Sequence, residues 1–164
     1  MAGGYMGKLL FVNLANGGVN AETLDEGFCR KFYGGYGFGA SILYERMPAK
    51  VDPLGPENML GFISGPLTGT PALVGSRYVV VGKSPLTHTW GDANSGGYFG
   101  TALKHAGYDG VFFSGISDKP GYLLIQEGKS ELRDAAHLWG KDSHDTEDML
   151  KAAHGRQTNI SCIG

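Results

Sequence analysis

The sequence predicts an α+β fold in which short strands outnumber short helices. Residues 8–14 and 19–23 read as strands, and they flank an Asn-Gly-Gly turn at 16–18 that is typical of a tight hairpin. Residues 122–126 and 130–133 flank a Glu-Gly turn in the same way. Because the paired strands are mostly hairpins, we expect α+β architecture rather than a doubly wound parallel sheet.

The other expected elements are separated by glycine and proline. The remaining strands are expected at residues 59–63, 77–81, 110–114 and 159–163. Helices are expected at about residues 25–32, 39–46, 98–105 and 143–154, with Asp25 and Ser143 as caps and Gly155 as the carboxy-terminal stop. Residues 66–76 and 83–97 are expected to be long loops.

Length and composition fit one globular domain without a nucleic-acid partner. The chain has 164 residues, of which 41% are hydrophobic, enough for a substantial core. The formal net charge is −2 and only 18% of residues are charged, so the basic stripe of a nucleic-acid binder is missing. The 28 glycines follow no Gly-X-Y period, which indicates many tight turns.

The expected strand at 159–163 needs a turn and a neighbouring strand. We therefore expect a single domain over residues 1–164 that is cut before its end. The alternative is a natural carboxy-terminal edge strand.

The cysteines and histidines do not predict a metal site. Cys29 and Cys162 are far apart and form no CxxC pair, so neither a zinc site nor an iron–sulfur cluster can be built from them. We expect two reduced thiols in a cytoplasmic protein, with Cys29 in the core, and no membrane association. The five histidines show no metal-binding spacing and are expected to be structural or exposed.

The residues most suggestive of chemistry lie between 65 and 109. Asn94, Ser95, Gly96 and Gly97 precede an expected helix, so bare backbone N–H groups there could face an anion. From the pattern alone, a plain capped turn is the favoured interpretation. Arg77 could reach the solvent, or it could bind a phosphate or a planar heterocycle with its fixed donors.

The loop at residues 65–70 adds the hydroxyls of Thr68 and Thr70, although an ordinary turn would look the same. Together these features suggest a pocket for a flat, polar, phosphate-bearing ligand.

Seven sequence blocks, spread in order over most of the chain, resemble the aldehyde ferredoxin oxidoreductase family. They are DPLGPEN (52–58), GPLTGT (65–70), RY (77–78), KSPLT (83–87), NSGGYFG (94–100), LKHAGYD (103–109) and DAAHLWG (134–140). The resemblance covers only the first part of a family enzyme. It implies a layered β domain with a few short helices that cradles a tungsten, or molybdenum, bis-pterin cofactor.

The resemblance also implies roles for individual residues. Arg77 would contact a pterin, and the backbone carbonyl of Asn94 would help to hold a magnesium ion that bridges the two cofactor phosphates. Gly96 would lie against the cofactor, with Ser95 and Gly97 beside it. Lys83 and the 65–70 loop are weaker candidates. No residue of this chain is expected to be catalytic.

By resemblance, the complete enzyme would oxidise aldehydes to carboxylic acids and pass electrons one at a time to ferredoxin. A [4Fe-4S] cluster would have its ligands outside this chain. The expected partners are ferredoxin, the aldehyde and the remaining domains of the same enzyme, with a homodimer as a further option. The piece alone is expected to be inactive. The alternatives are a related enzyme that reduces aromatic acyl thioesters and a non-catalytic scaffold domain.

Overall fold

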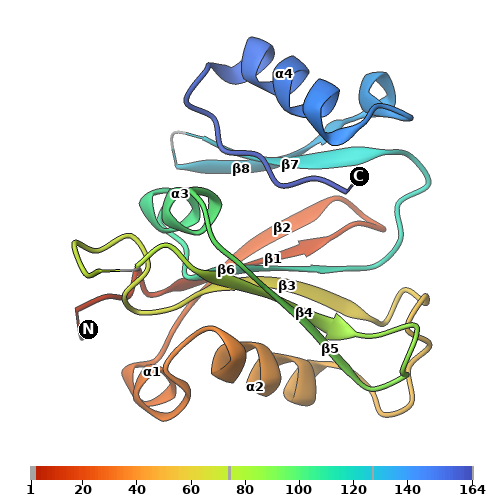
Figure 1. Cartoon of the computed structure of the whole chain (residues 1–164). Helices are drawn as coiled ribbons and strands as arrows, with labels where there is room; N and C mark the ends of the chain where they lie inside the picture. Colours follow the sequence, from red (N-terminus) through yellow and green to blue (C-terminus); the bar gives the residue numbers. More distant parts are fainter. Residues whose placement is uncertain (1–2, 74, 127, 164) are drawn as a thin grey trace.

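The computed structural model describes residues 3–73, 75–126 and 128–163, and it confirms the α+β class. In the described residues a six-stranded mixed sheet has the order β2-β1-β6-β3-β4-β5 (Figure 1). Its strands are β1 (Lys8–Asn13), β2 (Gly18–Thr23), β3 (Met59–Ser64), β4 (Tyr78–Lys83), β5 (Trp90–Ser95) and β6 (Gly110–Ser114). The strands β1 and β6 are parallel, and the other neighbouring pairs are antiparallel.

Both faces of the central strand β1 are covered, as its apolar sequence requires. Side chains alternate between the two faces of a strand. Leu9 belongs to the core on one face of the sheet, whereas Leu10 and Val12 belong to the core on the other. Leu9, Leu10 and Val12 can therefore all be buried although they lie in one strand.

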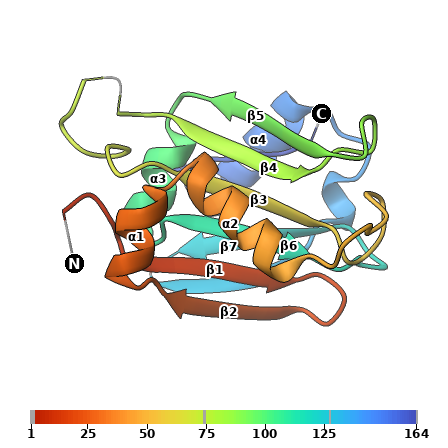
Figure 2. The ribbon, with the colours of Figure 1, turned by 90° about the horizontal axis from the view of Figure 1, so that it is seen from below.

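Two helices cover the first face. The helices α1 (Glu26–Phe32) and α2 (Tyr36–Arg46) lie across the sheet, as Figure 2 shows. The approach of α2 is close at Gly39, where an added Cβ would come 2.9 Å from a methyl group of Val81. Glycine at this position therefore allows the helix to sit directly on the sheet.

The opposite face is only partly covered. The helix α3 (Phe99–His105) and the hairpin of β7 (Gly121–Gln126) and β8 (Lys129–Asp134) pack on it, with helix α4 (Ser143–His154) on the hairpin's far side (Figure 1). The parts of β3, β4 and β5 that this layer does not cover carry exposed side chains, such as Leu60 and Ala93.

Several sequence expectations need correction. The loop expected at 83–97 contains β5, which pairs with β4 along its whole length although few of its side chains are apolar. The helix α2 begins at Tyr36, three residues early, and α4 is capped by Asp142 rather than Ser143. Residues 159–163 form no strand; Ile160 instead packs against the small core beneath α4.

Both cysteines are free thiols, and Cys29 is fully buried as expected. Burial raises the pKa of the Cys29 thiol, so it stays protonated at neutral pH. No cluster of three metal-ligating side chains occurs among the described residues. None of the helices described is long and apolar enough to cross a bilayer.

An ion pair between Glu22 and Arg46 predicts a small pH dependence of stability. The hydrogen bond from Arg46 holds the pKa of the Glu22 carboxyl below its usual 4.5. The pair therefore stabilises the fold above that pH, and the contribution is lost as the pH falls through the lower folded-state pKa. Since both side chains are more than a third exposed, we expect Glu22→Gln to cost only about 0.5 kcal/mol at pH 7.

Urea denaturation at pH 7 and pH 3 tests this. The difference between wild type and Glu22→Gln should shrink at pH 3, and Glu57→Gln, at an exposed residue, should show no difference at either pH. An equal loss at both pH values would contradict the assignment.

Candidate functional site

The candidate site lies where three neighbouring strands end. The last pair between β3 and β4 is Ser64 with Tyr78, and the last pair between β4 and β5 is Tyr78 with Ser95. One step further along both registers, Arg77 stands between Gly65 on one side and Gly96 on the other. The antiparallel sheet thus brings together residues that are 12 and 19 positions apart in sequence.

Arg77 lies against Gly96, as the hypothesis of a shared site requires. A Cβ built on Gly96 would be 3.4 Å from Nη1 of Arg77 and 3.7 Å from its Cδ. Arg77 and Gly96 are therefore direct neighbours, in ordinary van der Waals range, on the same side of the strand ends. Arg77 is exposed, and its guanidinium forms no hydrogen bond or ion pair within the described ranges. Its donors are available to a ligand.

The register also determines the direction of the Asn94 backbone. The amide of Ser84 donates to the carbonyl of Thr89 (2.9 Å), so these two residues form a hydrogen-bonded pair at the β4–β5 turn. Hydrogen-bonded and non-hydrogen-bonded pairs alternate along an antiparallel ladder. Counting from Ser84, the pair of Val79 with Asn94 is non-hydrogen-bonded. The Asn94 carbonyl therefore points away from β4, at an edge of the six-stranded sheet.

Ser95 and Gly97 lie beside these groups, but neither Asn94 nor Ser95 caps the helix. The cap of α3 is Tyr98, which makes no side-chain capping bond, and the Ser95 hydroxyl donates to the carbonyl of Gly96 (3.4 Å). Gly97 has φ of 86°, a conformation that strongly favours glycine. A capped turn, the favoured sequence interpretation, is therefore wrong.

The polar groups of the weaker candidates bond the protein's own backbone. The Thr68 hydroxyl donates to the Arg77 carbonyl and accepts from Gly65, and the Thr70 hydroxyl donates to Leu67. The ammonium of Lys83 donates to the carbonyl of Val51 (2.6 Å). These three polar groups serve the fold, and none is positioned as a free ligand donor.

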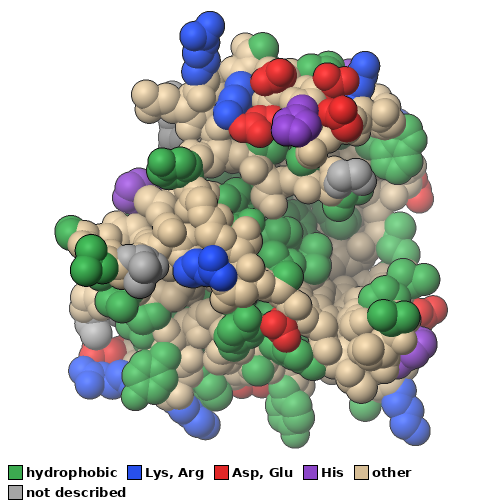
Figure 3. Space-filling view, viewed as in Figure 1, with side chains coloured by type: hydrophobic (Ala, Val, Ile, Leu, Met, Phe, Trp, Pro, Cys, Tyr) green, Lys and Arg blue, Asp and Glu red, His purple; other side chains and the backbone are tan. Residues whose placement is uncertain are grey.

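The face that carries the open part of the sheet is hollowed. Figure 3 shows a recess between the β7–β8 layer and the lower sheet strands, with hydrophobic side chains at its bottom. Along the strands, Leu60, Val80 and Ala93 share this side of the sheet by register and none of them is fully buried. By the same register the Cβ of Arg77 falls on the other side of the sheet, with those of Val79 and Asn94. Two further hollows, beside the β1–β2 turn and beside residues 117–120, include neither Arg77 nor Asn94.

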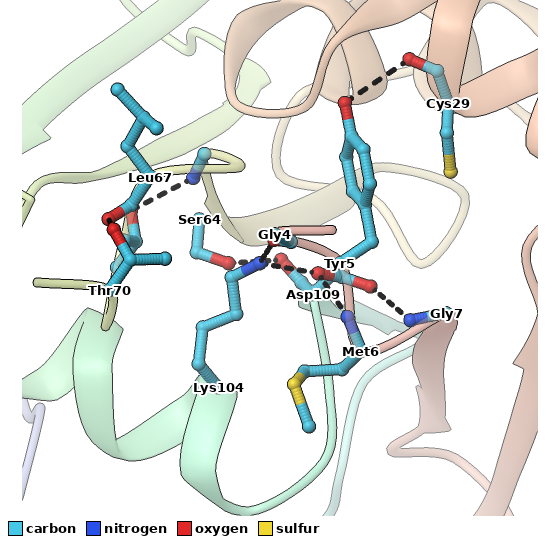
Figure 4. A network of polar contacts seen from close by, with 12 residues as sticks. Gly4, Tyr5, Met6, Gly7, Cys29, Ser64, Leu67, Thr70, Lys104 and Asp109 are labelled. Atoms are coloured by element: carbon cyan, nitrogen blue, oxygen red, sulfur yellow. Dashed lines mark hydrogen bonds and ion pairs between the residues drawn. The ribbon is translucent and has the colours of Figure 1, made fainter. Parts of the chain in front are cut away.

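A buried ion pair fixes the end of β3 beside this site (Figure 4). Lys104 Nζ lies 2.7 Å from Oδ1 of Asp109, and both side chains are almost fully buried. The Asp109 carboxylate also accepts the amides of Met6 (3.0 Å) and Gly7 (2.7 Å). Its backbone carbonyl accepts the hydroxyl and the amide of Ser64, the last residue of β3.

Sequence reasoning assigned no role to this pair. Lys104 and Asp109 stand in one of the resembling blocks, but a Lys and an Asp five residues apart near the end of a helix are ordinary surface residues by pattern. The sequence feature that indicates their contact is Gly107, which lies between them. Its positive φ (96°) turns the chain back after α3, so that Asp109 can reach Lys104.

Comparison with known proteins identifies the family. The family model for the aldehyde ferredoxin oxidoreductase N-terminal domain matches residues 9–164. The chain belongs to this family. It is 48% identical over 162 residues to the tungsten-containing aldehyde ferredoxin oxidoreductase of Pyrococcus horikoshii, which covers 98% of this chain and 27% of the relative. The corresponding enzyme of Pyrococcus abyssi is 49% identical over the same share.

Two further relatives carry other names. The aliphatic sulfonate oxidoreductase WOR-like subunit of Pyrococcus furiosus is 39% identical over 92% of this chain and 24% of its own length. A solved active-site complex BamBC of benzoyl coenzyme A reductase, with 1,5-dienoyl-CoA, matches with a TM-score of 0.92 at 37% identity, covering 96% of this chain and 24% of that one. This domain therefore spans about a quarter of the oxidoreductases that it resembles.

The ion pair generates a stability prediction. Asp109→Asn would leave the Lys104 ammonium buried without a counter-charge, so we expect the free energy of unfolding to fall by about 3–5 kcal/mol. Chemical denaturation of both proteins measures this.

The matched control is Glu26→Gln, which removes the exposed ion pair with Arg30 and should change stability very little. Equal effects of the two substitutions would contradict a special role for Asp109.

Proposed function

We propose that this domain holds the pterin cofactor of a tungsten-containing, or molybdenum-containing, enzyme that oxidises aldehydes to carboxylic acids. The observation that carries the proposal is the placement of Arg77, whose guanidinium pairs with none of the described residues, beside Gly96 at the strand ends. The relatives named tungsten-containing aldehyde ferredoxin oxidoreductases support the choice of metal and substrate.

The chemistry of the residues fits a bis-pterin with phosphate groups. The Arg77 guanidinium offers planar donors to a pterin or a phosphate. The outward carbonyl of Asn94 offers a hard oxygen ligand, which Mg²⁺ prefers. Gly96 and Gly97, with Ser95 beside them, leave the main chain accessible to a large group.

The bound cofactor would supply the two-electron redox chemistry at its metal, and the residues of this domain would orient it. We propose that ferredoxin accepts the electrons through a [4Fe-4S] cluster whose ligands lie elsewhere in the enzyme. The aldehyde would be bound largely by the remaining domains. A cytoplasmic location and a homodimer are further parts of the proposal.

The second candidate is reduction of an aromatic acyl thioester, favoured by the TM-score of 0.92 to the benzoyl coenzyme A reductase complex. The identity of 48–49% to the aldehyde enzymes, against 37% to that complex, supports aldehyde oxidation. Assay of the native protein with aldehydes and with aryl-CoA thioesters decides between them. A protein without tungsten, molybdenum or either activity would instead be a scaffold.

One prediction concerns the contribution of Arg77 to cofactor binding. In the native protein, Arg77→Ala should lose most of its bound tungsten, about 10–100-fold faster on dialysis, because a charge-assisted contact of ~1.5–3 kcal/mol is removed. Metal content by inductively coupled plasma mass spectrometry measures the loss. Gly96→Ala should act in the same direction, because the added Cβ, in contact with Arg77, would occupy space proposed for the cofactor.

The control is Gly3→Ala, at a glycine where an added Cβ meets nothing within 4 Å. Wild-type metal retention in Arg77→Ala would contradict the proposed contact.

The second prediction separates a backbone ligand from a side-chain ligand. If the magnesium ligand is the Asn94 carbonyl, Asn94→Ala keeps that oxygen, and the magnesium content should stay within about twofold of wild type. A side-chain ligand would lose the metal in the same variant. Magnesium per tungsten, measured after gel filtration, decides between these two outcomes.

A further inference from the structure

The side chain of Thr68 takes the place of a missing backbone hydrogen bond between β3 and β4 beside Arg77. The strands β3 and β4 pair as far as Ser64 and Tyr78, so Gly65 and Arg77 would form the next pair. They are bridged by the hydroxyl of Thr68, which accepts from the Gly65 amide (3.1 Å) and donates to the Arg77 carbonyl (2.7 Å).

The hydroxyl is held firmly in this bridge. Thr68 is only 5% exposed, and its methyl group would lie 3.3 Å from a Cβ at Gly100, in the first turn of α3. Both hydrogen-bonding roles of the hydroxyl are used within the protein. The last fixed point of β3, Ser64, is itself anchored by the Asp109 carbonyl.

We propose that Thr68 is the positioning residue for Arg77, a role that rests on the proposed function. The bridge fixes the Arg77 carbonyl on the β3 side, while the side chain lies along Gly96 on the β5 side. Arg77 precedes the first residue of β4 and follows a long loop, so the ladder alone does not hold it. Thr68 thereby sets where the guanidinium meets a planar or phosphate-bearing group of the cofactor.

The test replaces the hydroxyl without changing the shape of the side chain. Thr68→Val in the native protein should lose tungsten about tenfold faster than wild type, since the Arg77 carbonyl loses its hydrogen-bond partner. Thr68→Ser, which keeps the hydroxyl, should restore retention. The matched control is Thr70→Val, which removes a hydroxyl of the same loop that bonds Leu67 and not Arg77.

A double substitution tests whether Thr68 acts through Arg77. In an Arg77→Ala background, Thr68→Val should cause no further loss of tungsten, because the contact that it positions is already absent. Additive losses in the two variants would overturn the proposal, as would a Thr68→Val protein that cannot fold at all, since Thr68 would then be a general stabiliser.

A second measurement does not depend on the cofactor. Trypsin cleavage of the Arg77–Tyr78 bond should be several-fold faster in Thr68→Val than in Thr70→Val or wild type, because the segment is released. Equal cleavage would overturn the role of Thr68 by itself. A wild-type protein that contains neither tungsten nor molybdenum, yet shows the cleavage difference, would overturn the proposed function and leave the hold on Arg77 standing.

Discussion

The ion pair of Lys104 and Asp109 is the constraint on which the rest of the site depends. A carboxylate and an ammonium that are 1% and 3% exposed as whole residues must satisfy each other, since either one alone in the core would be costly. Their other partners come from two distant segments, the amino-terminal residues 4–7 and the end of β3. The pair thus fixes the end of β3, where the 65–70 loop begins. Within that loop, the Thr68 hydroxyl holds the Arg77 backbone through a hydrogen bond.

The sequence was sufficient for most elements because their signals are local. Glycine turns marked the β1–β2 and β7–β8 hairpins, Asp25 marked the start of α1, and apolar runs marked β1, β3 and β6. Resemblance added the residues of the candidate site, and the structure brings Arg77 next to Gly96 as that hypothesis required. Their roles toward a cofactor stay predictions that the proposed substitutions test.

What the sequence could not supply depends on partners distant in the chain. The strand β5 has an exposed, polar and glycine-containing sequence, and it is a strand because the backbone of β4 pairs with it. Residues 159–163 look like a strand, but no strand pairs with them. By sequence, Thr68 resembled a ligand donor. Its hydroxyl instead bridges Gly65 and Arg77, which only the β3–β4 register shows to be opposite each other.

The placement of the site at strand ends has a physical consequence for the whole enzyme. Arg77 is exposed and the Asn94 carbonyl lies at a sheet edge, so under the proposed function this domain would contact a large flat ligand from one side only. Ligand pockets that bind tightly cover most of the ligand surface. A cofactor held here therefore needs a second wall, and relatives about four times longer than this domain have the chain to build it. This domain would supply the rigid side of such a site. The Lys104–Asp109 ion pair and the Thr68 hydroxyl hold the strand ends and the Arg77 backbone in place before any ligand binds.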